Sequence, residues 1–243
     1  MARADVWHPY CGAAPDPAAW LLHWNLDPWL LLAVGLGLYW WNRVPANHRS
    51  ASAAYAALAL FAILYVSPFC ALGSALFIAR VTHHVLLAVA LAPLVALAFG
   101  LQHRRLPGSI ALWTALQTAI FWAWHWPPLY AAALSNDLIF WAMQASITAA
   151  AVGFWVKVLR ASSLGAIAAL LATMIQMGVL GALITFAPSA LYAPHWSSTA
   201  AWGLAPLEDQ QIAGLVMWAP AAAAYLLAAL AIGWRAIGGQ PTR

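Results

Sequence analysis

Charge is what this sequence lacks most. Of its 243 residues only 7% are Asp, Glu, Lys or Arg, whereas 65% are hydrophobic. A soluble domain carries about 25% charged residues to cover its surface, so the composition excludes a soluble protein. The formal net charge of +4 comes from only ten basic residues, which are too sparse to form a nucleic-acid-binding surface. We therefore expect an integral membrane protein that contacts the lipid bilayer and binds no nucleic acid.

Cysteine and lysine are also scarce, and each shortage excludes a kind of site. The chain has two cysteines, too few for a thiolate metal cluster of the zinc-finger type. Its single lysine, Lys157, lies at the end of the fifth hydrophobic stretch, so the last helix has no lysine that can hold a retinal. The first 25 residues lack the basic and apolar segments of a signal peptide, and we expect the first span to direct insertion.

Long hydrophobic stretches are abundant, and they predict the fold. A helix needs about 20 apolar residues to cross about 30 Å of hydrocarbon, and seven stretches in series approach that length. We predict an all-α integral membrane protein, a seven-transmembrane-helix bundle (26–237) with an outer N-terminal arm (1–25) and a short cytoplasmic tail (238–243). The stretches are residues 28–41, 51–72, 76–100, 108–126, 138–159, 164–187 and 210–234.

The charged residues predict the orientation of this bundle. Basic residues are enriched in the cytoplasmic joints of membrane proteins. Only Arg3 and Arg80 fall on one side of the predicted bundle, together with all six acidic residues. We therefore predict that the N-terminus is outside and the C-terminus is cytoplasmic. The basic residues on the predicted cytoplasmic side are Arg43, Arg49, Arg104, Arg105, Lys157, Arg160, Arg235 and Arg243.

Three histidines lie in the outer halves of predicted spans, where ionisable groups are costly and usually face the bundle interior. His83 and His84 are about two turns inside the third stretch, and His125 is near the end of the fourth. Adjacent helical residues point about 100° apart, so we expect His84 to be a metal ligand and His83 to support it or line its entry. The alternatives are an interhelical hydrogen bond for the pair and an interfacial aromatic belt for His125.

The start of the seventh stretch is polar. Asp209 precedes Gln210, which shares a helical face with Met217 by its spacing of seven residues. Imidazole and thioether groups without thiolates suit copper better than zinc. The alternatives are that Asp209 complements a helix dipole and that Met217 packs in the core. We predict that four side chains converge in the outer third of the bundle and bind copper: His84, His125, Asp209 and Met217.

The two cysteines are predicted to lie on the same side of the membrane. Cys11 is in the outer arm, and Cys70 is at the outer end of the second stretch. A disulfide is permitted on an oxidising side. Two unrelated reduced cysteines are the main alternative, and a shared copper role is the third.

Several motifs occur in the same order in a known family. The most specific is Asp209–Pro220, because a polar Asp-Gln-Gln at the start of a membrane helix is uncommon. The others are Trp24–Trp29, Ser67–Phe69, His84–Leu87 running to Pro93, Trp124–Tyr130, Leu180–Pro188 and Leu191–Tyr192. In these motifs the chain resembles the CtaG family of cytochrome c oxidase assembly factors, seven-span proteins associated with copper delivery to haem-copper oxidases. Relatives often have histidines where this chain has Arg80 and Gln144.

The resemblance implies a non-enzymatic assembly factor in the bacterial inner (plasma) membrane. Such a protein would hold or position copper on the outer side during oxidase maturation, with haem-copper oxidase subunits or a copper donor protein as partners. Two alternatives stay open: a haem protein with His84 and His125 as axial ligands, and a metal-free structural subunit of an oxidase complex. A transporter is disfavoured, because no chain of polar residues continues into the cytoplasmic half.

Overall fold

The computed structural model describes residues 7 and 9–238, and every regular element within them is helical. In addition to four long apolar helices, the pair Ala51–Val66 and Phe69–Ala75 forms a fifth candidate span if it crosses the membrane as one unit with its 43° bend. Long apolar helices of this kind make the chain an all-helical, multi-pass membrane protein. Four units are long and apolar enough to cross a membrane: Phe77–Ala98, Asp137–Arg160, Ser163–Thr185 and Pro206–Gly238.

Two of the seven predicted spans are short helices. α1 (Pro28–Arg43) has 16 residues and α6 (Ile110–Trp124) has 15. At about 1.5 Å per residue they are about 24 and 23 Å long, less than the hydrocarbon thickness of about 30 Å. Pro127 and Pro128 cannot continue the hydrogen-bond ladder of α6, and they instead begin α7 (Pro127–Ala133). Seven spans and their orientation therefore stay predictions.

The second predicted stretch is broken rather than continuous. α2 (Ala51–Phe61) runs into a π-helical segment, Ala62–Val66, and α3 (Phe69–Ala75) follows the break. Pro68 has no N–H to continue the ladder. The Ser67 hydroxyl accepts from the Phe69 amide at 3.2 Å, so this serine is a partner for the first amide of the new helix.

The third stretch also contains a π-helical segment. α4 (Phe77–Leu86) is followed by the segment Leu87–Leu91 and then by α5 (Ala92–Ala98). The indole Nε1 of Trp155 donates to the Ala88 carbonyl oxygen at 2.7 Å, which supplies a side-chain partner where the ladder is irregular. Single π-helical turns are frequent at functional sites, and this one directly follows the turn that carries His84.

The later helices begin at polar caps. The Asn136 side chain accepts from the first amides of α8 (Asp137–Arg160). Ser162 caps α9 (Ser163–Thr185). At the start of α10 (Pro206–Gly238), the Glu208 carboxylate accepts from the Ala205 amide at 2.8 Å, which satisfies an amide that the helix leaves unpaired.

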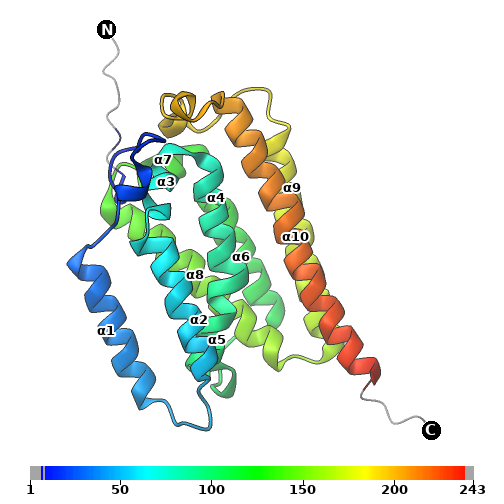
Figure 1. Cartoon of the computed structure of the whole chain (residues 1–243). Helices are drawn as coiled ribbons and strands as arrows, with labels where there is room; N and C mark the ends of the chain where they lie inside the picture. Colours follow the sequence, from blue (N-terminus) through cyan, green and yellow to red (C-terminus); the bar gives the residue numbers. More distant parts are fainter. Residues whose placement is uncertain (1–6, 8, 239–243) are drawn as a thin grey trace.

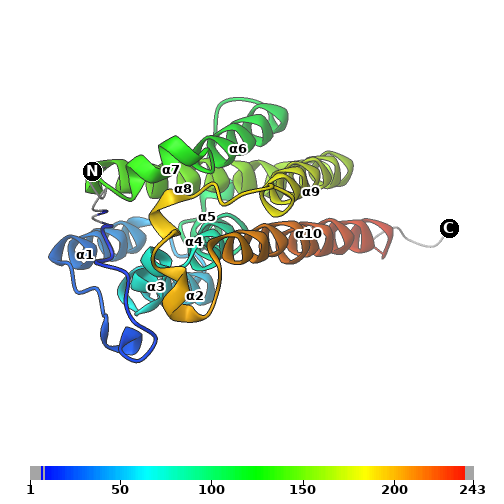
Figure 2. The same ribbon diagram turned by 90° about the horizontal axis from the view of Figure 1, so that it is seen from above.

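The helices form a bundle with α1 on one side and the α9–α10 pair on the other (Figures 1 and 2). α9 and α10 approach closely because glycines meet at their crossing. A Cβ atom added to Gly214 would lie 2.6 Å from the Gly181 carbonyl oxygen. Small residues allow such close backbone contact between membrane helices.

The N-terminal arm is fixed over one end of the bundle. Cys11 and Cys70 form a disulfide with their Cα atoms 5.4 Å apart, which decides between the alternatives left open by the sequence. The Tyr10 hydroxyl donates to the Asp27 carboxylate at the start of α1. The backbone N–H of Asn25 donates to the Val66 carbonyl oxygen at 2.9 Å. The arm is therefore tied to α1, to α3 and to the end of the π-helical segment.

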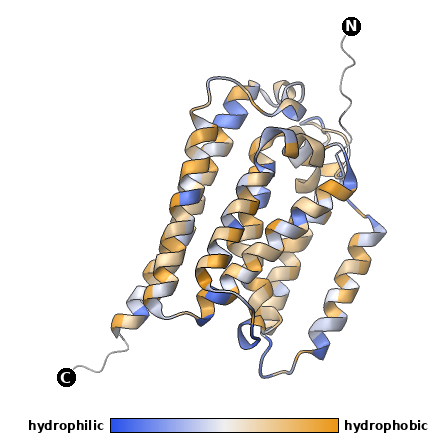
Figure 3. Ribbon diagram, turned by 180° about the vertical axis from the view of Figure 1, so that it is seen from behind, coloured by the Kyte–Doolittle hydropathy of each residue, from blue (hydrophilic) through white to orange (hydrophobic). Residues whose placement is uncertain are grey.

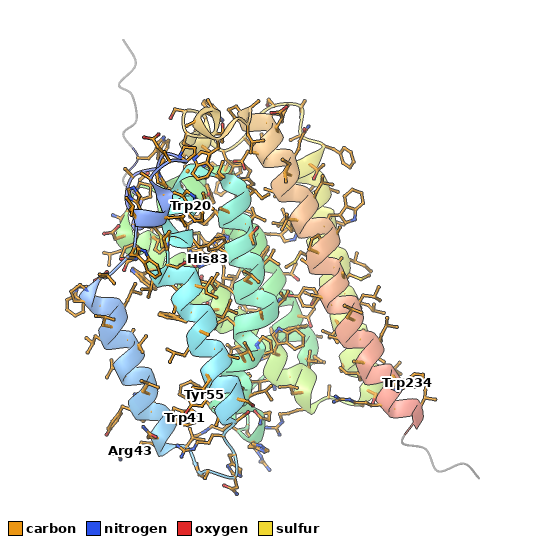
Figure 4. All side chains as sticks on the ribbon, viewed as in Figure 1. Trp20, Trp41, Arg43, Tyr55, His83 and Trp234 are labelled. Carbon is orange, nitrogen blue, oxygen red and sulfur yellow. A yellow bond between two sulfur atoms is a disulfide. The ribbon has the colours of Figure 1, made fainter. Side chains whose placement is uncertain are left out.

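The opposite end of the bundle gathers basic residues. Lys157 donates to the Leu106 carbonyl oxygen at 2.5 Å, and Arg160 donates to the Arg104 carbonyl oxygen. Arg43 also lies at this end, away from the arm (Figure 4). In Figure 3 hydrophilic residues lie mainly at the helix ends, whereas the helix bodies are mainly apolar. Arg3, Asp5 and Arg243, which entered the orientation argument, lie outside the described residues.

Candidate functional site

α4 carries three buried ionisable side chains within two turns of its start. Arg80, His83 and His84 are each at most 1% exposed. The helix begins at Phe77, so the two histidines lie at the predicted depth. Figure 4 shows His83 in the half of the bundle nearer the arm, which is marked by Trp20.

α6 ends where His125 meets His84. The centroids of the two imidazole rings are 5.3 Å apart, and the ring planes are almost perpendicular at 88°. A metal–imidazole bond is about 2 Å and a ring nitrogen is about 1 Å from its centroid, so two imidazoles on one ion have centroids about 5–6 Å apart. The structure thus brings the first two predicted ligands together.

The surroundings of His125 leave one ring nitrogen available. Its Nδ1 lies 2.7 Å from the Phe121 carbonyl oxygen. This oxygen can only accept, so Nδ1 carries the proton and donates it. Nε2 is buried and has no hydrogen-bond partner within the described residues. Metal-binding histidines commonly donate one N–H to a carbonyl in this way while the other nitrogen binds the ion.

Gln144 on α8 connects His84 with Tyr65. The Tyr65 hydroxyl donates to Gln144 Oε1 at 3.2 Å, and Gln144 Nε2 lies 3.4 Å from His84 Nε2. In this amide orientation Nε2 of His84 accepts, and the proton is on Nδ1. Reversing the amide exchanges its donor and acceptor, so that His84 donates to Gln144 and presents a lone pair on Nδ1. That Nδ1 atom is buried without a partner in the described part of the chain.

His83 is turned toward aromatic rings. Its centroid lies 4.9 Å from that of Tyr65 and 6.2 Å from that of Phe69. The His83 and His84 centroids are 6.1 Å apart. The structure therefore separates the two side chains as helix geometry predicts, with His84 beside His125 and His83 beside the π-helical segment Ala62–Val66 and α3.

Asp209 has a structural role in this arrangement. Its carboxylate accepts from the Phe77 amide at 2.6 Å and from the Ile78 amide at 3.1 Å. These are among the amides that the first turn of α4 leaves unpaired, and a carboxylate there also complements the helix dipole. His84 is six residues beyond Ile78, or about 9 Å along the axis. Asp209 thus joins the start of α10 to the start of α4.

Met217 lies in the core further along α10. It is fully buried and belongs to the hydrophobic cluster at the centre of the bundle. Gln210, two turns earlier on the same face, donates to the Ile184 carbonyl oxygen at 3.1 Å and accepts from the Leu191 amide at 2.6 Å. Helix and loop contacts therefore account for the polar residue Gln210, and core packing accounts for Met217.

Arg80 is not an exposed outer charge, contrary to its use in the charge count. It is 0% exposed, and its Nε donates to the Gly73 carbonyl oxygen at 3.3 Å. Its guanidinium carbon lies 5.2 Å from the Phe140 ring centroid and Nη2 is 3.8 Å from the Cys11 sulfur. A Cβ at residue 73 would lie 2.9 Å from that guanidinium carbon, so only glycine leaves room for it.

The sequence interpretation missed a second polar pair near the end of the bundle that carries the arm. The Tyr130 hydroxyl and His195 Nε2 are 2.7 Å apart, and both residues are buried. Burial lowers the pKa of His195 to about 3, so its imidazole is neutral at ordinary pH. Tyr192, whose pKa is raised by burial, donates to the His125 carbonyl oxygen at 2.8 Å. Tyr130 and Tyr192 fall inside the family motifs, and this is the sequence signal from which these polar contacts could have been predicted.

The predicted four-residue convergence is not found. Among residues 7 and 9–238 no three His, Cys, Asp or Glu side chains lie close enough to hold one metal ion. His84 and His125 are together, whereas Asp209 caps α4 and Met217 is in the core. Copper binding by the histidine pair stays a prediction.

These features define a multi-pass helical membrane protein with a buried histidine pair toward one end. A sequence model of the family described as cytochrome c oxidase caa3 assembly factor (Caa3_CtaG) matches residues 33–238. The chain therefore belongs to this family, and the resemblance seen in its motifs is confirmed. Neither the curated proteins nor the solved structures give a match.

Proposed function

We propose that this protein assists cytochrome c oxidase assembly by holding copper transiently between His84 and His125. In this proposal it is not an enzyme, it spans a bacterial plasma membrane seven times, and its arm faces outward. Family membership supports the link to oxidase assembly. The gathering of basic residues at the end away from the arm supports the orientation.

The observation that carries the copper role is the fixed tautomer of His125. Its Nδ1–H is committed to the Phe121 carbonyl, so Nε2 has a lone pair ready for a soft or borderline cation. Imidazole suits copper among other metals. No protonation change is needed at this residue when the ion arrives.

His84 and Gln144 provide the adjustable half of the site. When the Gln144 amide oxygen accepts from His84 Nε2–H, the Nδ1 lone pair of His84 is free for the cation. Tyr65 then accepts from the amide nitrogen instead of donating to the oxygen. This exchange reverses one amide and needs no backbone movement.

A two-imidazole site suits a carrier that must release its cargo. A resident structural metal commonly has four protein ligands, whereas here two neutral imidazoles face the ion and the buried carboxylate of Asp209 caps α4 instead. Copper itself would be the cargo passed to an oxidase subunit or taken from a copper donor protein. The residues of this chain bind it, orient it and exclude bulk water.

Copper binding to the purified full-length protein tests the proposal. We expect about one copper per chain, and loss of that copper in both His84→Ala and His125→Ala. His23→Ala is the matched control, because His23 is exposed and distant in sequence from both sites. Unchanged copper in the two site variants would contradict the proposal. A haem absorption band that disappears in those variants would instead support the haem alternative.

A metal-free structural role is the second candidate. It is favoured by Asp209 and Gln210, whose polar groups are used for helix contacts. In that case the histidine layer holds helices together. The variants would then lower the stability of the protein while the purified wild-type protein contains no copper.

A further inference from the structure

A partly open slot of about 330 Å³ lies between α1 and the rest of the bundle. Its walls come from α1, α2, α5 and α8, and this volume falls at the lower end of the range for small-molecule sites. Along α1 the wall runs from Ala33 to Trp41, and along α2 and its π-helical continuation from Ala54 to Tyr65. Figure 1 shows α1 standing beside α2, and Figure 4 places Trp41 toward the end away from the arm.

The slot is long and narrow. Eleven residues separate Ala54 from Tyr65, which is about 16 Å at 1.5 Å per residue. The volume divided by that length gives a cross-section of a few tens of Å². A helix with its side chains is about 10 Å across and needs about 80 Å². The space therefore suits one extended chain, and a whole helix does not fit inside it.

The lining is apolar with one polar end. None of the described residues that line the slot is charged. Tyr65, Gln144 and Thr148 bring a hydroxyl, an amide and a second hydroxyl to one end, whereas Trp41 and Phe99 are at the other. The Gln144 amide has two N–H groups, and one of them remains after its contact with His84. The polar end can thus bond to an uncharged carbonyl or hydroxyl group.

Side-chain contacts hold α1 at both of its ends. Tyr10 binds Asp27 at the outer end. Arg49 donates to the Trp41 carbonyl oxygen at 3.1 Å and its guanidinium carbon lies 4.2 Å from the Trp41 ring centroid. Gly37 of α1 faces the slot. A Cβ atom added to it would meet no atom within 4 Å, so this part of the slot has room for an occupant.

We propose that this slot binds one uncharged amphiphile from the bilayer, with a single alkyl or isoprenoid chain and a carbonyl or hydroxyl head group. The head group lies at the end formed by Tyr65, Gln144 and Thr148, of which Thr148 is the least buried, and the chain extends toward Trp41. Because Gln144 also contacts His84, the occupant touches the same hydrogen-bond chain as the histidine pair. Binding of the amphiphile does not require copper, so the two proposals can fail separately.

Photolabelling of the full-length protein in phosphatidylcholine nanodiscs tests this binding. The probe is hexadecanol with a diazirine in mid-chain, and labelled peptides are identified by mass spectrometry. Labels are expected on α1 between Ala33 and Trp41 and on α8 between Trp141 and Thr148. Unlabelled hexadecanol and a decyl-substituted benzoquinone should compete, and their relative potency reports whether a hydroxyl or a carbonyl head is preferred. Palmitate at pH 9 should not compete, because no lysine or arginine lines the slot.

Two glycines of α1 provide matched variants. Gly37→Phe fills the slot and should lower labelling by about tenfold, a binding change of about 1.4 kcal/mol. Gly35→Phe adds the same side chain on the same helix, also in open space, but residue 35 does not line the slot. It should leave labelling unchanged. Ala145→Leu and Ala142→Leu form a second such pair on α8 if the Phe variants do not fold.

Three results would overturn the proposal. The first is equal labelling of slot-filling and control variants that fold normally. The second is labelling confined to other helices. The third is a loss of self-association or of a bound partner helix in the slot-filling variants with labelling unchanged, which would mean that protein rather than an amphiphile covers α1.

Discussion

Asp209 at the start of α10 accepts a hydrogen bond from the Phe77 amide, 2.6 Å away at the start of α4. The two residues are 132 positions apart in the sequence. This contact fixes where α4 begins, and therefore the depth at which His84 meets His125. A carboxylate that looked like a metal ligand is thus a positioning residue for the histidine pair.

Replacing this carboxylate should destabilise the protein. Loss of a capping side chain costs about 0.5–2 kcal/mol, and we expect Asp209→Ala to fall at the upper end because the group is buried. Denaturation in mixed detergent micelles measures the change. Asp137→Ala is the control, since Asp137 is exposed in the first turn of α8. Normal stability of Asp209→Ala with loss of bound copper would make Asp209 a ligand instead.

The α9–α10 crossing should be sensitive to one added methyl group. Gly214→Ala places a Cβ 2.6 Å from the Gly181 carbonyl oxygen, and overpacking of this kind costs about 1–3 kcal/mol. Gly178→Ala is the matched control on α9, because its nearest new contact is an ordinary 3.5 Å from Trp218. The same unfolding measurement should show a loss for the first variant only. Equal stability of both would mean that the crossing relaxes.

The disulfide gives a test of sidedness. Cys11 and Cys70 are bonded, so a membrane-impermeant maleimide should label intact cells only after reduction. Labelling that requires permeabilised cells would place the arm in the cytoplasm and reverse the orientation. A reporter fused after Arg243 should independently behave as cytoplasmic.

Acidification should destabilise the folded protein in part through His195. Its pKa is about 3 in the folded state and about 6.5 in an unfolded chain. Between these values the unfolded chain binds the proton and the folded protein does not, so stability falls as pH is lowered from about 6.5. His195→Gln should reduce this dependence by up to about 1.4 kcal/mol per pH unit. His23→Gln, at an exposed site, should leave the slope unchanged, and an unchanged slope in His195→Gln would contradict the assignment.

Local patterns predicted much of the architecture because they act over a few residues. The burial of His84 follows from the cost of ionisable groups in lipid. The closeness of His125 followed from similar depth in two helices. Short-range signals of this kind are present in a single sequence.

The rest depended on contacts between distant segments. Nothing near Asp209 shows that Phe77 will need its carboxylate, and nothing near Arg80 shows that Gly73 makes room for a buried guanidinium. The break at Ser67–Pro68 had a local signal in the proline, but continuous hydropathy concealed it. The contacts that join Tyr65 to Gln144 and Gln144 to His84 likewise require three helical elements to be placed first.

The copper content of the oxidase made in cells tests the central claim most directly. The gene for this protein is replaced by His84→Ala, by His125→Ala or by the control His23→Ala, and the variants are compared at equal membrane abundance. The account predicts a copper-deficient oxidase with both site variants and normal copper with the control. Normal oxidase copper in all three strains would contradict it, because the histidine pair would then be structural.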